Sequence, residues 1–158
     1  MQLLEIKKYP QKILRKKCVS LSRVTQREKT LFEQMLFAMK YFSGIGLAAP
    51  QVGILRKMIV VEVEGRITKL ANPQILRVKG ADVMEERCLS VPGLGVDIVR
   101  PYEAIIKGLN EEGQAVEIKA KGLFARVLQH EIDHLCGKLI VDYLSFWQSL
   151  KFKVKALR

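Results

Sequence analysis

The chain has 158 residues, 49% of them hydrophobic and 27% charged, which is an ordinary composition for a globular protein large enough to bury a core. Its 27 basic and 16 acidic residues give a net charge of +11, which favours an anionic partner surface such as a ribonucleoprotein, although a basic solvated surface explains it as well. The first residues lack a secretory signal and no apolar run could span a bilayer, so we expect a cytoplasmic protein without a membrane partner.

The first predicted element is an amphipathic helix over residues 25–42. Thr25 and Glu28 have the spacing of a capping box, in which each side chain accepts a hydrogen bond from the other residue's free amide. A glycine at position 44 then suggests the end of the helix. Apolar residues recur at helical spacing through this segment at Leu31, Phe32, Met35, Leu36, Met39 and Phe42.

The middle of the chain predicts β-strands. Its runs are short, rich in β-branched residues and separated by turn residues. Glu111, Glu112 and Gly113 form a turn signal between two of these runs, which predicts a hairpin. The candidate strands are 57–65, 67–73, 102–110 and 114–122, with weaker candidates at 74–84 and 96–100.

A second helix is predicted over residues 123–136. Its apolar spacing indicates a mostly buried helix, and Gly137 would end it. The tail over 144–158 is basic and predicted to be helical, although apolar and basic residues alternate in part of it, as they do in a strand. We expect one domain over residues 1–158 of the α+β class, with mostly antiparallel sheets around a central metal-binding helix, an N-terminal helix and a short C-terminal helix.

The sequence QHEIDH (129–134) contains both histidines of the chain. On a helix, His130 and His134 lie on the same face and can bind one cation, while Glu131 lies beside them as a candidate base for an activated water. The alternative is a buried helix with two hydrogen-bonded core histidines. The spacing and the adjacent glutamate favour a metal site.

A catalytic metal site needs a third protein ligand. No histidine follows His134, and Cys136 would point away because it lies about 200° round the helix. The ligand must therefore come from upstream, where a thiolate is available at Cys18 or Cys88. We favour Cys88, because we expect Pro92-Gly93 to break the chain after it and leave it on a loop. Cys18 and Cys136 would then be small buried hydrophobic residues.

Three motifs in this order, GIGLAAPQVG (44–53), ERCLSVPG (86–93) and QHEIDHLCG (129–137), resemble those of peptide deformylase, and the resemblance covers essentially the whole chain. It implies a metal-dependent hydrolase that removes the N-formyl group from the initiator methionine of new polypeptides and releases formate. It also implies one metal ion per chain, bound by Cys88, His130 and His134. This ion would be Fe²⁺, with Zn²⁺, Ni²⁺ or Co²⁺ as possible substitutes.

The resemblance also implies roles for individual residues. Glu131 would act as general base and later as acid, with a water on the metal as nucleophile. The Gln51 amide and the Leu89 backbone N–H would stabilise the oxyanion. The substrate-binding residues would be Gly46, which lines the site, and Ile45, Leu123 and Val127, which correspond to the methionine pocket.

The chain departs from the resemblance at Arg87, where the motif of the family carries glycine. If this position required a positive φ, arginine would strain the ligand loop. We favour an extended backbone with the side chain pointing outward at the rim of the cleft. Asp133 is expected to form an ion pair, with Arg100 as a candidate partner, rather than to bind the metal.

Two other functions remain open from the residues alone. One is a metallopeptidase, which the lack of a downstream ligand disfavours. The other is a basic ribosome-binding or nucleic-acid-binding protein with a vestigial site. The expected partners are N-formylmethionyl nascent peptides, with ribosome association through the basic surface or the C-terminal tail and no DNA.

Overall fold

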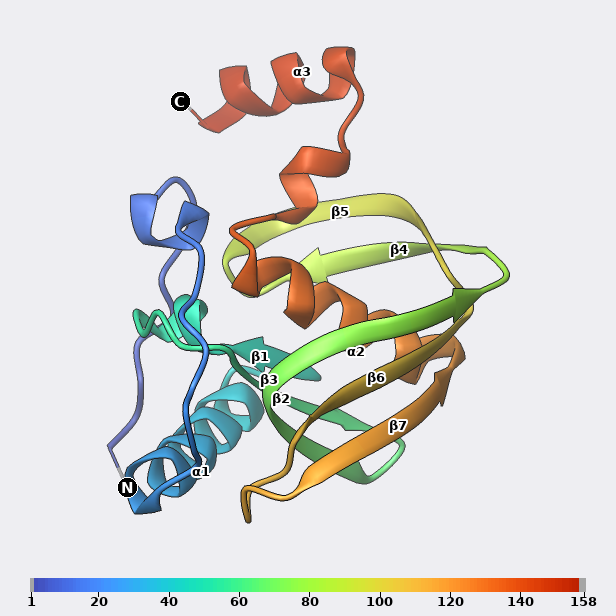
Figure 1. Ribbon diagram of the computed structural model, residues 1–158. Coiled ribbons are helices and arrows are strands. Elements are labelled where there is room, and N and C mark those ends of the chain that lie inside the picture. Colours follow the sequence, from blue (N-terminus) through green and yellow to red (C-terminus); the bar gives the residue numbers. More distant parts are fainter. Residues whose placement is uncertain (1, 157–158) are drawn as a thin grey trace.

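The computed structural model describes residues 2–156 and contains two antiparallel β-sheets with a helix, α2, lying between them (Figure 1). A second long helix, α1, covers the opposite face of the larger sheet. A third, α3, follows near the C-terminus and lies beside the smaller sheet. The predicted α+β class with a central helix is therefore confirmed. None of the helices in residues 2–156 is long and apolar enough to cross a membrane.

The larger sheet has the strand order β1-β2-β3-β6-β7, and β4 pairs with β5 in the smaller sheet. Every pairing between neighbouring strands is antiparallel. The helices are α1 (Gln26–Tyr41), α2 (Gly122–Leu135) and α3 (Phe146–Ala156), with 3₁₀ turns at Lys12–Arg15, Ala49–Val52 and Ile140–Tyr143. The strands are β1 (Gly46–Ala48), β2 (Met58–Val63), β3 (Arg66–Lys79), β4 (Asp82–Cys88), β5 (Val91–Arg100), β6 (Glu103–Leu109) and β7 (Ala115–Lys121).

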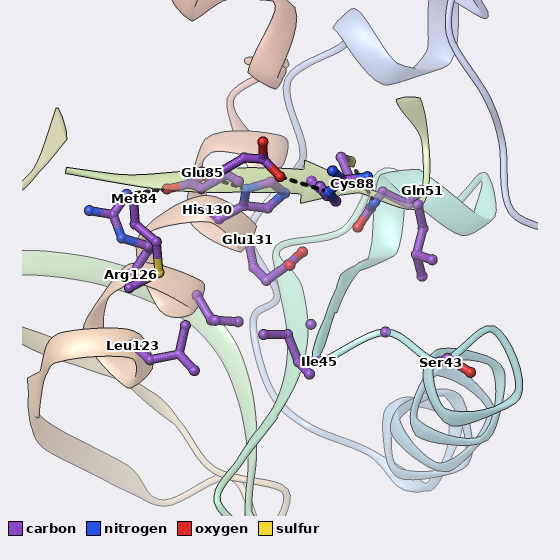
Figure 2. A pocket seen from close by; sticks show the side chains of 16 residues that line it. Ser43, Ile45, Gln51, Met84, Glu85, Cys88, Leu123, Arg126, His130 and Glu131 are labelled. Atoms are coloured by element: carbon purple, nitrogen blue, oxygen red, sulfur yellow. Dashed lines mark hydrogen bonds and ion pairs between the residues drawn. The ribbon is translucent and has the colours of Figure 1, made fainter. Parts of the chain in front are cut away.

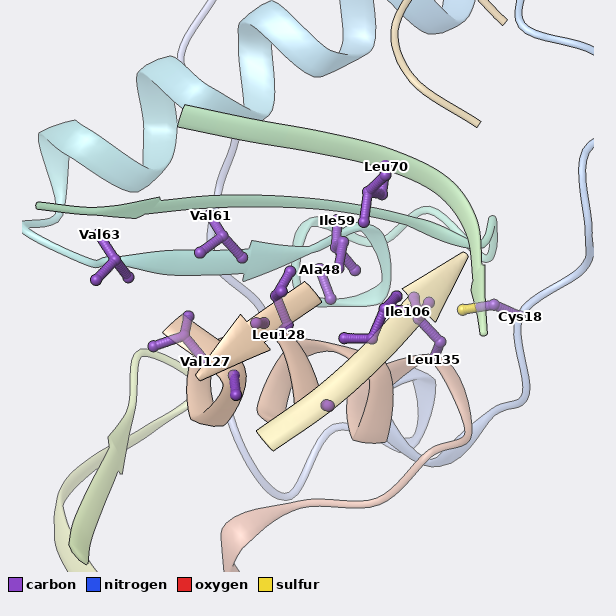
Figure 3. Close-up of a cluster of buried hydrophobic side chains, with 13 residues drawn as sticks. Cys18, Ala48, Ile59, Val61, Val63, Leu70, Ile106, Val127, Leu128 and Leu135 are labelled. Atoms are coloured by element: carbon purple, nitrogen blue, oxygen red, sulfur yellow. The ribbon is translucent and has the colours of Figure 1, made fainter. Parts of the chain in front are cut away.

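Strand β2 is buried on both of its faces, which explains its continuous apolar run. Ile59 and Val61 point towards α2 and pack with Leu128 of that helix (Figure 3). Met58 and Val60 point to the other face and pack against α1. Because side chains alternate along a strand, this one run contributes to a core cluster on each face of the sheet and fixes α2 against it.

Helix α1 begins and ends close to its predicted limits. The capping box between Thr25 and Glu28 is present, and the helix runs over Gln26–Tyr41. The residue with left-handed backbone after the helix is Ser43, with a φ of 57°, and not Gly44. The amide of Gly44 donates to the carbonyl of Met39 at 2.9 Å, so Gly44 takes part in ending the helix as predicted. A Cβ at Gly44 would also approach Cδ1 of Leu89 to 2.8 Å, so this glycine allows close packing against the next motif.

The strand predictions need two corrections. The candidate over 74–84 is divided between the end of β3 and the start of β4, with Gly80 in a left-handed turn between them. Pro92 and Gly93 do not break the chain after Cys88, because both lie within β5. A register shift occurs where the Cys88–Val91 pair follows the Arg87–Gly95 pair. That bulge accommodates the proline without ending the strand. The predicted hairpin between β6 and β7 is confirmed.

The C-terminal tail is helical over Phe146–Ala156, and the remainder of the predicted segment at 157–158 lies outside the described residues. Cys18 is buried as expected, but Cys136 is exposed. The exposure of Cys136 corrects the prediction that it is a buried hydrophobic residue. It follows from the position of Cys136 at the C-cap of α2, on the side turned away from the core.

Candidate functional site

Helix α2 and the end of β4 bring together the two histidines and one cysteine. The Nε2 atoms of His130 and His134 lie 3.2 Å apart, and Sγ of Cys88 lies 3.3 Å from Nε2 of His134. All three side chains are buried. The one-turn separation on α2 places the two rings on one face of the helix, where they meet edge to face, and Cys88 at the end of β4 lies next to them.

The cluster fits a tetrahedral cation. Ligand bonds of about 2.0–2.1 Å for nitrogen and about 2.3 Å for sulfur would separate the two nitrogens by about 3.3 Å and a nitrogen from the sulfur by about 3.6 Å. The distances of 3.2 and 3.3 Å are within a few tenths of an ångström of these values. Two imidazoles and a thiolate leave one of four positions for a reactant. The role of these residues as metal ligands stays a prediction that this geometry supports.

Glu86 orients the first of the two rings. Its Oε2 lies 2.8 Å from Nδ1 of His130, which leaves Nε2 of that ring facing the cluster. Arg100 binds Glu86 through two nitrogens, at 2.5 and 2.9 Å, and Arg126 donates to it at 2.8 Å. Burial alone would raise the pKa of Glu86, but the bonds from His130 and Arg100 outweigh burial and hold it at about 2. Glu86 is therefore a buried anion fixed by two arginines.

The sequence did not predict this network of Glu86, Arg100 and Arg126. Glu86 was interpreted only as a retained motif residue, and Arg126 was not singled out. The signal available was Arg126, a charged residue within a helix predicted to be mostly buried. The partners of Arg126 depend on contacts between β4, β5 and α2. The predicted ion pair between Asp133 and Arg100 is present, at 3.0 Å.

The two histidines share a charged environment. Burial opposes a charge on His130, but its hydrogen bonds with Cys88 and Glu86 outweigh burial and raise its pKa to about 10. Burial and the neighbouring charge of His130 lower the pKa of His134. Binding of a cation by the cluster would therefore displace a proton from the facing nitrogens.

Glu131 lies beside the cluster with its carboxylate directed into a cavity (Figure 2). It is buried, and its Oε2 has no hydrogen-bond partner within residues 2–156. Burial raises the pKa of Glu131 to about 7, while the charge of His130 opposes that shift. A buried carboxylate oxygen that faces a cavity can exchange a proton with a molecule bound there.

The predicted oxyanion residues lie next to Cys88. Gln51 is buried in the 3₁₀ turn after β1, where its Oε1 accepts a hydrogen bond of 2.8 Å from the amide of Ala48. This bond aims Nε2 towards Ser90, whose Oγ it approaches to 3.2 Å, and towards the Cys88 sulfur at 3.5 Å. Leu89 is the first residue of the turn that follows Cys88. Both residues therefore lie next to the cluster, and their role in binding an oxyanion stays a prediction that this position supports.

A cavity of about 410 Å³ opens in front of these residues. Every predicted substrate-binding residue lines it, namely Ile45, Gly46, Leu123 and Val127. It lies between Gly46 on β1 and the residues 84–88 of β4. Within residues 2–156, each of these strands pairs with one strand of its sheet, so each presents an edge without a strand partner. Residues that the sequence did not suggest also line the cavity, among them Met84, Glu85 and Arg126 (Figure 2).

The structure distinguishes the two interpretations of Arg87. Arg87 is not among the residues of positive φ, and it lies in β4 with its side chain 71% exposed. It lines the same cavity and pairs with Glu85 at 2.9 Å. The extended backbone with an outward side chain is therefore confirmed. The alternative thiol, Cys18, packs in the core cluster below α2 and does not belong to the Cys–His–His group.

Comparisons with known proteins agree with this geometry. The family model described as polypeptide deformylase matches residues 3–149. The peptide deformylase of Thermodesulfovibrio yellowstonii is 45% identical over 150 residues, which cover 92% of this chain and 91% of that protein. The crystal structure of a peptide deformylase from Legionella pneumophila has a TM-score of 0.91 at 35% identity and covers 99% of both chains. That of a peptide deformylase from Synechococcus elongatus, in complex with actinonin, has a TM-score of 0.91 at 36% identity, covering 97% of this chain and 85% of that one.

Proposed function

The chain belongs to the polypeptide deformylase family of hydrolases, and we propose that it removes the N-formyl group from the initiator methionine of newly made polypeptides. The observation that carries this proposal is the buried carboxylate of Glu131, which faces the cavity beside the Cys88–His130–His134 cluster. A hydrolase needs a proton acceptor next to the place where water is activated. Glu131 would be this proton acceptor, and Cys88, His130 and His134 would bind the cation that activates the water.

We propose one divalent cation at the cluster, with Fe²⁺ as the natural ion and Zn²⁺, Ni²⁺ or Co²⁺ as substitutes. A thiolate and two imidazoles suit several first-row metals, so the choice of iron rests on the resemblance. When bound, the cation would polarise the formyl carbonyl and lower the pKa of a water molecule at the site. The ligand atoms lie at separations that support this assignment.

Glu131 would remove the proton from the attacking water and later deliver it to the amide nitrogen. The water oxygen forms the new bond to the formyl carbon, the C–N bond breaks, and formate and a free amino terminus leave. The Gln51 amide and the Leu89 N–H would donate to the oxygen that gains charge. The loss of one such donor typically costs about 3 kcal/mol of transition-state stabilisation. The hydrogen bond from Ala48 to Gln51 supports this role because it orients the amide.

The shape of the cavity supports an extended peptide as substrate. A peptide strand can pair with the unpaired edges of β1 and β4, through backbone hydrogen bonds that do not depend on sequence. Ile45, Leu123 and Val127 would hold the methionine side chain in the apolar part of the cavity. Gly46 would let the substrate and Glu131 approach each other closely.

Further proposals concern where the reaction takes place and what the protein associates with. We propose that the substrates are nascent peptides in the cytoplasm and that one domain over residues 1–158 acts on them. Ribosome association would use the basic surface or α3, whose Lys151, Lys153 and Lys155 are exposed. The net charge of +11 supports attraction to an anionic surface.

The test is to purify the protein without oxygen, measure its metal content, and assay formate release from formyl-Met-Ala-Ser. Glu131→Gln is the matched variant, because it should retain the metal and lose about 10²-fold or more in kcat. Formate release by the wild type and its loss in this variant would support the proposal. Stoichiometric metal without formate would favour a binding protein with a vestigial site. Robust cleavage of unformylated casein would favour a metallopeptidase.

A further inference from the structure

Arg87 and Glu85 form an exposed ion pair on the edge of the substrate cavity. Their side chains are 71% and 52% exposed, and Nε of Arg87 lies 2.9 Å from Oε1 of Glu85. Both residues line the cavity, and Figure 2 labels Glu85 on β4 among the lining residues. The pair adds nothing to the buried network that holds His130. Its exposure and its place beside the cavity make it available to a bound peptide.

We propose that Arg87 and Glu85 determine which charges the enzyme prefers in the residues that follow the formylmethionine, and that Arg87 favours an acidic side chain there. This inference rests on the proposed function, because it concerns the same cavity and the same peptide.

The geometry of the pair leaves Arg87 free to bind a second carboxylate. Glu85 contacts only Nε, and neither terminal nitrogen of the guanidinium has a hydrogen-bond partner within residues 2–156. A guanidinium carries five N–H donors in a planar fork, which can bind a carboxylate through two parallel bonds. The other arginine that lines the cavity, Arg126, is buried and bonded to Glu86, Ile98 and Asp82. Arg87 is therefore the accessible arginine of this cavity.

Gly95 makes room for the pair. It lies opposite Arg87 in the β4–β5 register. A Cβ at Gly95 would approach the Glu85 carboxylate, with Cδ at 2.5 Å and Oε2 at 2.7 Å. Gly95 does not have a positive φ, so its backbone accepts alanine. The absence of a side chain at position 95 therefore lets the Glu85 carboxylate lie over β5 and still reach Arg87.

Strand geometry predicts which substrate residues would contact the pair. Glu85 and Arg87 lie on one face of β4, whereas Glu86 and Cys88 point towards α2. A peptide paired with the edge of β4 would lie about 4.8 Å away, with its side chains on alternate faces. The charge effect should therefore be larger at one of the two positions after methionine than at the other.

The test measures kcat/KM for formyl-Met-Ala-Ser and for peptides with aspartate or lysine at the second or the third position. For the wild type, the acidic peptide should exceed the basic one by about twofold to fivefold at the more sensitive position, as expected for an exposed ion pair. In the Arg87→Gln variant, the ratio of kcat/KM for the acidic peptide to that for the basic peptide should fall to one or below. Glu85→Gln should increase it, because Arg87 would lose a competing carboxylate.

Gly95→Ala provides a variant without a change in charge. Its Cβ would displace the flexible end of Glu85, so the acidic preference should rise as it does in Glu85→Gln. Arg77→Gln is the matched control, since Arg77 is an exposed strand residue that does not line the cavity. This control should leave the ratio at the wild-type value, and higher salt should reduce the ratio in the wild type.

Different results would overturn the proposed function and the proposed charge preference. If the metal-loaded wild type releases no formate from any peptide, both the proposed function and this inference are overturned. If formate is released but the ratio is near one, or if the variants of Arg87 and Glu85 change all peptides equally, only the inference is overturned. Equal charge effects at both positions would also contradict it, because they would indicate a general field rather than contact with the pair.

Discussion

Gly46 on β1 and Glu131 on α2 face each other so closely that a side chain at position 46 would collide with the Glu131 carboxylate. A Cβ there would overlap Oε1 of Glu131 and would approach its Cδ and Cγ1 of Val127 to 2.9 Å. Gly46 is held in place by its pairing with Val61 of β2, and α2 is held by its packing on the same sheet. Neither backbone can move away readily. The orientation of the proposed catalytic carboxylate therefore depends on a glycine in another motif.

We expect Gly46→Ala to displace the carboxylate of Glu131. Since a misplacement of about 1 Å can cost on the order of 10²-fold, kcat should fall by about that factor, while the metal content stays at the wild-type level. Formate release and metal analysis on the same preparation measure both quantities. In the comparison variant Gly44→Ala, the new Cβ would meet the flexible side chain of Leu89, so its loss should be smaller. A Gly46→Ala enzyme with wild-type kcat would contradict the proposed role of Glu131.

Cys88→Ala should lose the metal. The variant would remove the sulfur that lies 3.3 Å from His134 Nε2, and two imidazoles alone bind a divalent ion more weakly. Metal content after gel filtration should fall well below one ion per chain, and formate release should fall with it. Cys136→Ala is the control, because this exposed cysteine lies outside the Cys–His–His group. If Cys88→Ala retained its metal and full activity, the ligand assignment would be wrong.

Glu86→Gln should reduce both stability and metal affinity. The substitution would leave two buried arginines, Arg100 and Arg126, without their shared anion, and breaking a buried pair typically costs about 3–5 kcal/mol. It would also weaken the hydrogen bond that orients His130, for which a loss of about 10-fold to 100-fold in metal affinity is typical. Urea unfolding and a competitive chelator titration measure the two effects.

The neighbouring Glu85→Gln serves as the control for this prediction. Because Glu85 is exposed, its substitution should change the free energy of unfolding by no more than about 0.5 kcal/mol. Equal effects of the two variants would show that Glu86 does not have the structural role assigned to it.

Glu28→Gln should change how stability depends on pH. The hydrogen bond from Thr25 lowers the pKa of the buried Glu28 carboxyl below its usual value of 4.5. A lowered pKa in the folded state stabilises the fold above the unfolded-state pKa, and the stabilisation disappears as the pH falls through the folded-state pKa. Urea unfolding should therefore show a deficit for the variant at pH 7 that shrinks below about pH 4.5. The exposed Glu112→Gln should show no such trend, and a deficit independent of pH would contradict the prediction.

Local patterns in the sequence determined much of the fold. The capping box at Thr25, the apolar period after it and the hairpin turn at Glu111–Gly113 act over a few residues, so they could be read without knowing the rest of the chain. The spacing of His130 and His134 likewise required only that this segment be a helix. The central helix and the antiparallel sheets were predicted on this basis, and the structure confirms them. The residues expected at the site lie around one cavity.

The tertiary structure alone decided which partners surround those residues. Glu86, Arg100 and Arg126 come from three different elements, and their common network exists only because β4 and β5 lie against α2. The continuation of β5 through Pro92 and the exposed pair at Arg87 depend in the same way on strand register. Sequence spacing constrains positions within one helix or strand. Contacts between elements depend instead on how buried faces and strand edges meet, and that is settled by packing over the whole chain.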